Sequence, residues 1–111
     1  MVLDSIISDD AEVSGAAIIQ SVISRSVEVG SGAQVAGSVL MPGARVGRGA
    51  KIRRTIVCEG AVIPEGERIG FDTAEDRHRF FVTENGVAVV HSSYARRLQD
   101  DPAYLQIAKS A

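Results

Sequence analysis

Aliphatic residues recur along the first seventy positions at one long interval. Triplets of a hydroxyl residue and two aliphatics are spaced 16, 17 and 17 residues apart, and they begin at Ser5, Ser21, Ser38 and Thr55. Between the triplets, single aliphatics repeat every 17 residues, at Ile18, Val35, Ile52 and Ile69. A second such series contains Val29, Val46 and Ile63. Self-similarity at a fixed period of this length is typical of solenoid proteins.

The spacing inside each repeat indicates short strands rather than helices. Consecutive aliphatic positions lie five or six residues apart with glycine between them, which fits neither the 3.6-residue helical period nor the two-residue period of an exposed strand. A short strand followed by a tight corner does fit, and three such segments make one coil. Stacked coils pair as parallel strands about 4.8 Å apart. We therefore predict about four coils in residues 1–70.

Small residues follow the aliphatics, as in the run Val46-Gly47-Arg48-Gly49-Ala50. Glycine allows corner conformations with positive φ, and the absence of aromatics before Phe71 fits a narrow coil. The pattern resembles the hexapeptide-repeat family, and this resemblance implies a left-handed parallel β-helix. A parallel sheet with ordinary loops is the alternative. The hydroxyls of the triplets either form a hydrogen-bonded ladder or face solvent.

Residues 71–111 differ in composition and are expected to form a capping tail of the same domain. All five aromatic residues and both histidines lie there. A short helix is predicted over 72–80, with Asp72 as its N-cap and Glu75 three residues later. Asn85-Gly86 between β-forming residues predicts a hairpin. Two further short helices are expected over 92–98 and 102–109.

The first coil has no comparable cover. Solenoids need a polar or covering cap at each end, yet the array starts abruptly with the aliphatics Val2, Leu3, Ile6 and Ile7. This indicates either a preceding segment or another chain that packs there.

Charge and cysteine content narrow the possible functions. Twelve basic and fourteen acidic residues give a net charge of −2, so there is no general electrostatic case for a nucleic-acid or membrane partner. The single cysteine, Cys58, excludes an internal disulfide framework and a multi-cysteine zinc site. No apolar run approaches the ~20 residues of a membrane span. A cytoplasmic location is expected.

The coils lack the residues that β-helix enzymes use. Hexapeptide acyltransferases use a coil histidine as general base, and related zinc hydratases use coil histidines as metal ligands. Residues 1–70 contain no histidine. We expect His78 and His91 to be surface residues and Cys58 to be a small, partly buried hydrophobe. No catalytic or metal-ligating residue is therefore predicted.

Basic residues cluster within about a coil and a half: Arg45, Arg48, Lys51, Arg53, Arg54 and Arg68. Stacking could bring several of them onto one face, where arginine forks suit phosphate oxygens. The alternative is a solvated surface with ion pairs to Glu59, Glu65 and Glu67.

One run of residues points to a particular protein family more specifically than the repeat does. It begins with Val62-Ile63-Pro64-Glu65-Gly66-Glu67-Arg68-Ile69-Gly70-Phe71-Asp72. It continues with Glu75-Asp76-Arg77-His78-Arg79-Phe80 and then with Val82-Thr83-Glu84-Asn85-Gly86-Val87-Ala88-Val89-Val90. This order of residues resembles the C-terminal β-helix of bacterial glucose-1-phosphate adenylyltransferases. The resemblance covers about residues 3–98. It implies a regulatory and oligomerisation domain of an enzyme of glycogen biosynthesis.

The resemblance also implies partners. The family's separate nucleotidyltransferase domain makes ADP-glucose and pyrophosphate from ATP and glucose 1-phosphate, and it binds the Mg²⁺. Neither catalysis nor a cofactor is expected of this chain alone. A homotetramer is implied, together with a phosphorylated effector.

Arg96 matches an activator position of the family and Arg97 is its neighbour, whereas Ser92 and Glu59 depart from two other effector positions. A free-standing acyltransferase-like protein and a structural β-helix scaffold are the alternatives.

Overall fold

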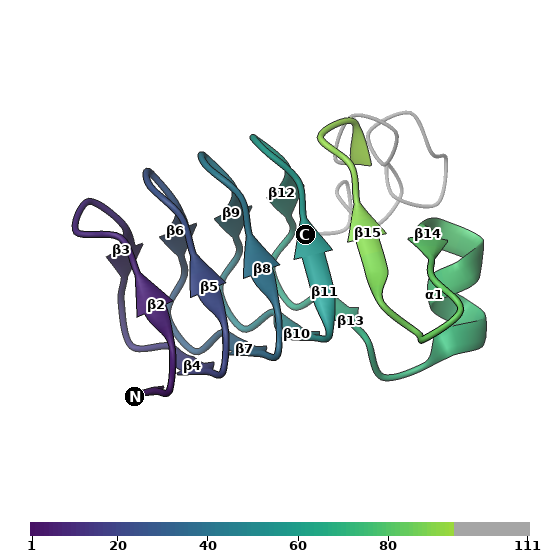
Figure 1. Cartoon of the computed structure of the whole chain (residues 1–111), viewed down its shortest axis with the longest axis horizontal. Helices are drawn as coiled ribbons and strands as arrows, with labels where there is room; N and C mark the ends of the chain where they lie inside the picture. The colour runs from purple at the N-terminus through teal and green to yellow at the C-terminus, as the bar shows by residue number, and fades with distance from the viewer. Residues whose placement is uncertain (95–111) are drawn as a thin grey trace, which may run out of the picture.

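Three short strands make up each turn of the chain, and the turns stack on one another (Figure 1). The structure is a computed structural model, and it describes residues 1–94. Strands at the same position in successive turns pair in parallel, which gives three sheets along the solenoid. The predicted parallel β-helix of about four coils is therefore confirmed.

The three sheets take their strands in turn along the chain. Sheet A contains β1 (Val2–Leu3), β4 (Ala17–Ile19), β7 (Gln34–Ala36), β10 (Lys51–Arg53) and β13 (Arg68–Ile69). Sheet B contains β2 (Ile6–Ile7), β5 (Val22–Ile23), β8 (Val39–Leu40), β11 (Thr55–Val57), β15 (Ala88–Val90) and β14 (Phe81–Val82). Sheet C contains β3 (Glu12–Val13), β6 (Glu28–Val29), β9 (Arg45–Val46) and β12 (Val62–Ile63).

The repeating aliphatics form the core as columns. In sheet A the inward residues stack in register and are all fully buried: Ile18, Val35, Ile52 and Ile69. Ile23, Leu40, Val57 and Val90 do the same in sheet B. Burying each such side chain contributes about 1.5–3 kcal/mol. The first coil is one residue shorter, because Val2 pairs with Ile18.

Alanine fills a second inward position two residues before many of the buried aliphatics of sheets A and C. Ala33, Ala44, Ala50 and Ala61 are completely or almost completely buried there. A larger side chain would have to displace the close-packed neighbouring coil. This narrow interior explains why the coils contain no aromatic residue.

The triplet hydroxyls form a ladder, which decides between the two possibilities that the sequence leaves open. The backbone N–H of Ser38 donates to Ser21 Oγ at 3.1 Å, and that of Thr55 donates to Ser38 Oγ at 3.1 Å. Each hydroxyl in turn donates to the carbonyl two residues earlier, as Ser38 does to Ala36 at 2.8 Å. All three residues are buried. The ladder therefore satisfies polar groups at one corner of every coil.

The residue before each ladder hydroxyl has a left-handed backbone. Its φ is 49° at Gln20, 56° at Gly37 and 50° at Arg54. The sequence predicts glycine at such corners, yet here only Gly37 is one. The stacked ladder holds the other corners in a conformation that L-residues adopt at a cost of about 1–3 kcal/mol.

The predicted short helix after the last coil is confirmed as α1 (Thr73–Arg79). Asp72 is its N-cap, because its Oδ1 accepts the N–H of Glu75 at 3.1 Å. After the helix, Phe80 is buried against the end of the solenoid. Within the described residues, α1 and residues 80–94 lie at the end of the solenoid beyond the last coil (Figure 1).

The hairpin around Asn85-Gly86 is confirmed, and it also extends the solenoid. β14 and β15 pair antiparallel. In addition, β15 pairs parallel with β11, so that Thr55 lies beside Ala88 and Val57 beside Val90. The sequence indicates a hairpin but not this pairing, because Val87 to Val90 read as an ordinary hairpin strand.

The helices expected over 92–98 and 102–109 lie largely or wholly outside the described residues. Within residues 1–94, no helix is long and apolar enough to cross a membrane.

Candidate functional site

The six clustered basic residues do not share one face. Arg45 and Arg48 lie on the sheet C side and form ion pairs with Glu28 and Glu65, at 3.1 and 3.0 Å. Arg54 lies at a corner, where its guanidinium donates to the carbonyl of Asn85. The other three basic residues project from sheet A, and they are Lys51, Arg53 and Arg68. The two alternatives, a phosphate-binding face and a solvated surface with ion pairs, therefore each describe part of the cluster. Arg45 and Arg48 are ion-paired, and three basic residues share the outer face of sheet A.

Arg53 and Arg68 stack on the same aromatic ring. Their guanidinium carbons lie 4.8 and 5.0 Å from the centroid of Phe71. Arg53 Nε also donates to the carbonyl of Gly70 at 3.1 Å, which fixes the stem of the side chain. Among residues 1–94 neither arginine forms an ion pair with a carboxylate. Two guanidinium groups held beside an exposed ring can bind a phosphate and stack on a planar group.

A groove of about 340 Å³ continues from this pair toward α1. Its walls are Arg68, Phe71, Asp72, Glu75, Asp76 and Arg79. The carboxylates on the α1 side limit how far an anion could enter. The Arg53–Phe71–Arg68 stack, of which Arg68 and Phe71 line the groove, is therefore the anion-binding candidate among the described residues.

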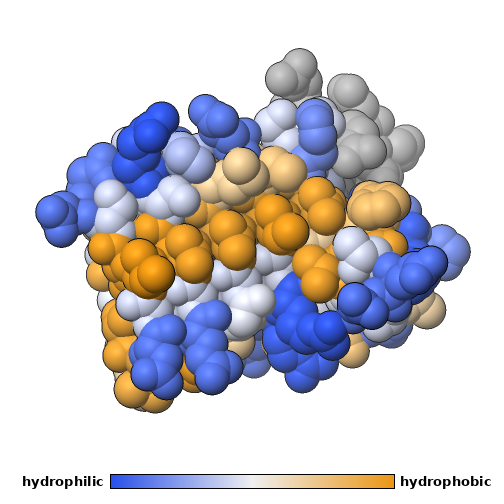
Figure 2. All heavy atoms as spheres, in the orientation of Figure 1, coloured by the Kyte–Doolittle hydropathy of each residue, from blue (hydrophilic) through white to orange (hydrophobic). Residues whose placement is uncertain are grey.

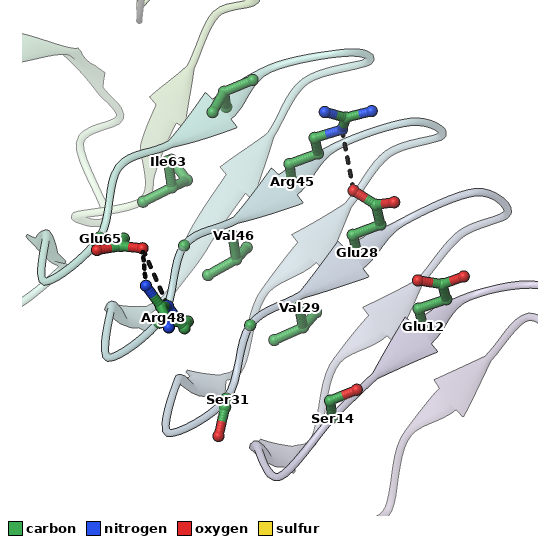
Figure 3. Close-up of a pocket in the computed structure, with 13 residues that line it drawn as sticks. Glu12, Ser14, Glu28, Val29, Ser31, Arg45, Val46, Arg48, Ile63 and Glu65 are labelled. Atoms are coloured by element: carbon green, nitrogen blue, oxygen red, sulfur yellow. Dashed lines mark hydrogen bonds and ion pairs between the residues drawn. The ribbon is translucent and has the colours of Figure 1, made fainter.

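A larger hollow of about 530 Å³ lies on the outer face of sheet C (Figure 3). Gly30 and Gly47 in its wall let successive coils approach closely: a Cβ would lie 2.7 Å from Arg48 N in the first case and 2.5 Å from Glu65 N in the second. Carboxylates and arginines alternate around it. Since its two arginines are already paired, the hollow offers no free cation to a phosphate, and the glycines are repeat corners as predicted.

A polar cluster closes the last coil. Glu67 occupies the position that alanine holds in earlier coils, and it pairs with Arg79. The hydroxyl of Tyr94 donates to Glu67 Oε2 at 3.1 Å. Arg79 also donates to the carbonyl of Arg68 at 2.7 Å and to Asp76 at 3.3 Å. These bonds join the cap to the solenoid.

Burial and the nearby Glu67 carboxylate raise the pKa of Tyr94 to about 12. The phenol therefore stays protonated across physiological pH and keeps donating to Glu67. Its ring also packs against Phe80, with 4.7 Å between the ring centroids. This arrangement stabilises the cap and is not set up for proton transfer.

The histidines and the cysteine lie where the sequence predicts. His78 and His91 are exposed, and both line a hollow beside β14. Cys58 is a free, half-buried thiol. Within residues 1–94 no three His, Cys, Asp or Glu side chains gather as a metal site would require.

The predicted effector residues Arg96 and Arg97 lie outside the described residues. Ser92 and Glu59, the two residues that depart from the family's effector pattern, are exposed. Sequence reasoning missed Phe71 as a partner of the basic residues, although its position three residues after Arg68 is the signal that could have found it.

The family model described as "GlmU-like, C-terminal hexapeptide" matches residues 1–90. The chain belongs to this family. The match includes α1 and the hairpin as well as the coils. No curated protein matches the chain. The resemblance to glucose-1-phosphate adenylyltransferases is finer than the family match and stays a prediction.

Proposed function

We propose that this GlmU-like hexapeptide domain is the regulatory and oligomerisation domain of a glucose-1-phosphate adenylyltransferase. One observation supports this most: the residues that carry the resemblance build the cap, which the repeat alone does not require. Gly70, Asp76 and Arg79 all belong to that run. A hexapeptide scaffold of another kind would also need a cap, but not one with this order of residues.

The cap requires particular residues at the matching positions. A Cβ on Gly70 would lie 1.8 Å from the carbonyl oxygen of Arg53, so only glycine fits. The N–H of Gly70 donates to Asp76 Oδ2 at 2.9 Å. In the hairpin, Thr83 Oγ1 accepts the N–H of Val87 at 3.0 Å. These contacts give a physical reason for the spacing of the Ile-Gly, Asp, Arg-Phe and Val-Thr-Glu elements.

The proposed role is binding rather than catalysis. The implied Mg²⁺ would belong to the separate nucleotidyltransferase domain, since no cluster of ligating side chains fits it within residues 1–94. This chain would supply positive charge for a phosphorylated effector. Arg53 and Arg68 lie ready for that role on sheet A. Arg96 and Arg97 are the proposed effector residues of the tail.

The proposal is tested by titrating AMP or a sugar bisphosphate into the full chain while following arginine side-chain NMR signals. We expect saturable shifts of Arg96 and Arg97, and loss of binding in Arg96→Ala. Arg25→Ala is the matched control, because Arg25 lies at a coil corner far along the sequence from both candidate groups. If neither ligand binds saturably, or if Arg96→Ala binds as well as the wild type, the effector role is wrong.

A further inference from the structure

The outer face of sheet B carries a continuous row of aliphatic side chains. The row runs strand by strand in register: Ile6, Val22, Val39, Ile56 and Val89, with Phe81 beside Val89 on β14. Figure 2 shows it as a band across β2, β5, β8, β11 and β15. Ile6 and Phe81, at its two ends, are each 71% exposed. Such a row is larger than the scattered apolar residues of an ordinary surface.

On one side of the row the flanking positions carry no carboxylate or guanidinium group, whereas on the other side the exposed Arg54 lies at the corner before β11. The neighbouring outward positions, one coil apart, are Ser8, Ser24, Met41, Cys58 and His91. On sheet C, by contrast, the corresponding outward residues include Glu12, Glu28 and Arg45. Depletion of charged residues around an apolar centre is typical of the core of a protein–protein interface.

The two ends of the row differ in charge. The first coil carries Asp4, Asp9 and Asp10. At the other end, a hollow of about 410 Å³ is lined by Phe81 and Val89 together with Arg77, His78 and His91, while Arg79 in its wall is already paired with Glu67 and Asp76. Carboxylates therefore flank the β2 end of the row, and basic side chains flank its β14 end.

We infer that the sheet B face binds a second copy of this chain, with the two solenoids antiparallel about a two-fold axis. In this arrangement Ile6 of each copy lies against Phe81 and Val89 of the other. The central strands β8 and β11 face their counterparts. This inference deepens the oligomerisation part of the proposed function.

Size and charge support this partner and this orientation. Six strands at about 4.8 Å spacing extend the row over about 24 Å. An interface that buries about 800 Å² on each partner would therefore include the row together with the positions that flank it. A two-fold interface is self-complementary. Antiparallel packing brings the acidic first coil to the basic hollow, whereas parallel packing would bring like charges together.

The surface is tested by a matched pair of substitutions. Val39 and Val62 are 39% and 37% exposed, on sheet B and sheet C respectively. Val39→Asp places an unpaired charge at the centre of the interface and should raise the dimer Kd by about 100-fold or more. Val62→Asp should leave it unchanged. Light scattering during gel filtration measures both, and circular dichroism checks that each variant is folded. Equal effects of the two substitutions would overturn the inference.

The orientation is tested by cross-linking in a Cys58→Ser background, since Ser24 already holds the equivalent position two coils earlier. A variant with both Ile6→Cys and Phe81→Cys should form a disulfide-linked dimer on mild oxidation. Ile6→Cys alone should not. Efficient cross-linking of Ile6→Cys to itself would show parallel packing and overturn the antiparallel arrangement.

The two proposals can fail separately. A chain that stays monomeric yet binds AMP or a sugar bisphosphate would contradict the dimer and leave the effector role standing. A dimer that binds neither ligand would contradict the effector role and leave the dimer standing.

Discussion

At Ser38 a single hydroxyl performs two roles that the fold repeats at every coil. It accepts the N–H of Thr55 and donates to the carbonyl of Ala36, at 3.1 and 2.8 Å. The buried N–H of Thr55 would otherwise lack an acceptor, whereas the carbonyl of Ala36 also accepts the N–H of Arg54 at 3.0 Å. A small hydroxyl residue is therefore required there for satisfaction of polar groups rather than for chemistry.

Replacing Ser38 with alanine should lower the free energy of unfolding by about 1–3 kcal/mol, because the buried N–H of Thr55 loses its acceptor. Ser38→Thr keeps the hydroxyl, and Thr55 shows that threonine fits the position in the next coil. We expect that variant to stay within about 1 kcal/mol of the wild type. Urea unfolding measures both, and an equal loss in the two variants would show that the hydroxyl is not what matters.

Tyr94 gives a pH prediction. Its pKa is raised to about 12 by burial and by the Glu67 carboxylate, against about 10 in an unfolded chain. Between these values the unfolded chain loses the phenolic proton while the folded chain keeps it. The stabilisation is thus complete below pH 10 and is lost as the pH rises toward 12.

Tyr94→Phe should therefore show a shallower fall in unfolding free energy between pH 10 and 12 than the wild type. At neutral pH it should be less stable by about 1 kcal/mol, since the bond to Glu67 is gone. Thermal unfolding across this pH range is the measurement. Identical pH slopes would contradict the burial of the phenol.

At the scale of elements, the coils could be predicted and the way they are closed could not. The 17-residue period of the aliphatics fixes strand positions and register, and Asn85-Gly86 identifies the hairpin. The parallel pairing of β15 with β11 depends on how the hairpin turns back, which no local pattern indicates. Likewise Glu67 stands in an alanine column because of Arg79 and Tyr94, and their proximity arises only when the chain folds.

Two glycines separate the effect of backbone conformation from that of close packing. Gly66 and Gly70 have φ values of 71° and 94°. A Cβ on Gly66 meets nothing within 4 Å, whereas on Gly70 it would overlap the backbone of Arg53. Gly66→Ala should cost about 1 kcal/mol. Gly70→Ala should cost more than about 3 kcal/mol, because overlap is added to strain. Equal losses on urea unfolding would mean that the cap does not approach the last coil so closely.

At the scale of the whole molecule, the three faces of the solenoid carry different kinds of side chain. Sheet C carries the Glu28–Arg45 ion pair, sheet A carries the Arg53–Phe71–Arg68 stack, and sheet B carries the apolar row. The sequence predicts the basic cluster but not its division, because assigning each residue to a face requires the corners to be placed. A domain built in this way can bind an anion on one face and a second copy on another.

The most direct test of this account is the mass of the chain in solution, measured by sedimentation equilibrium over a range of concentrations. One chain has a mass of 11.7 kDa, so dimer formation predicts that the apparent mass rises with concentration to twice this value. A mass of 11.7 kDa at every concentration would contradict it.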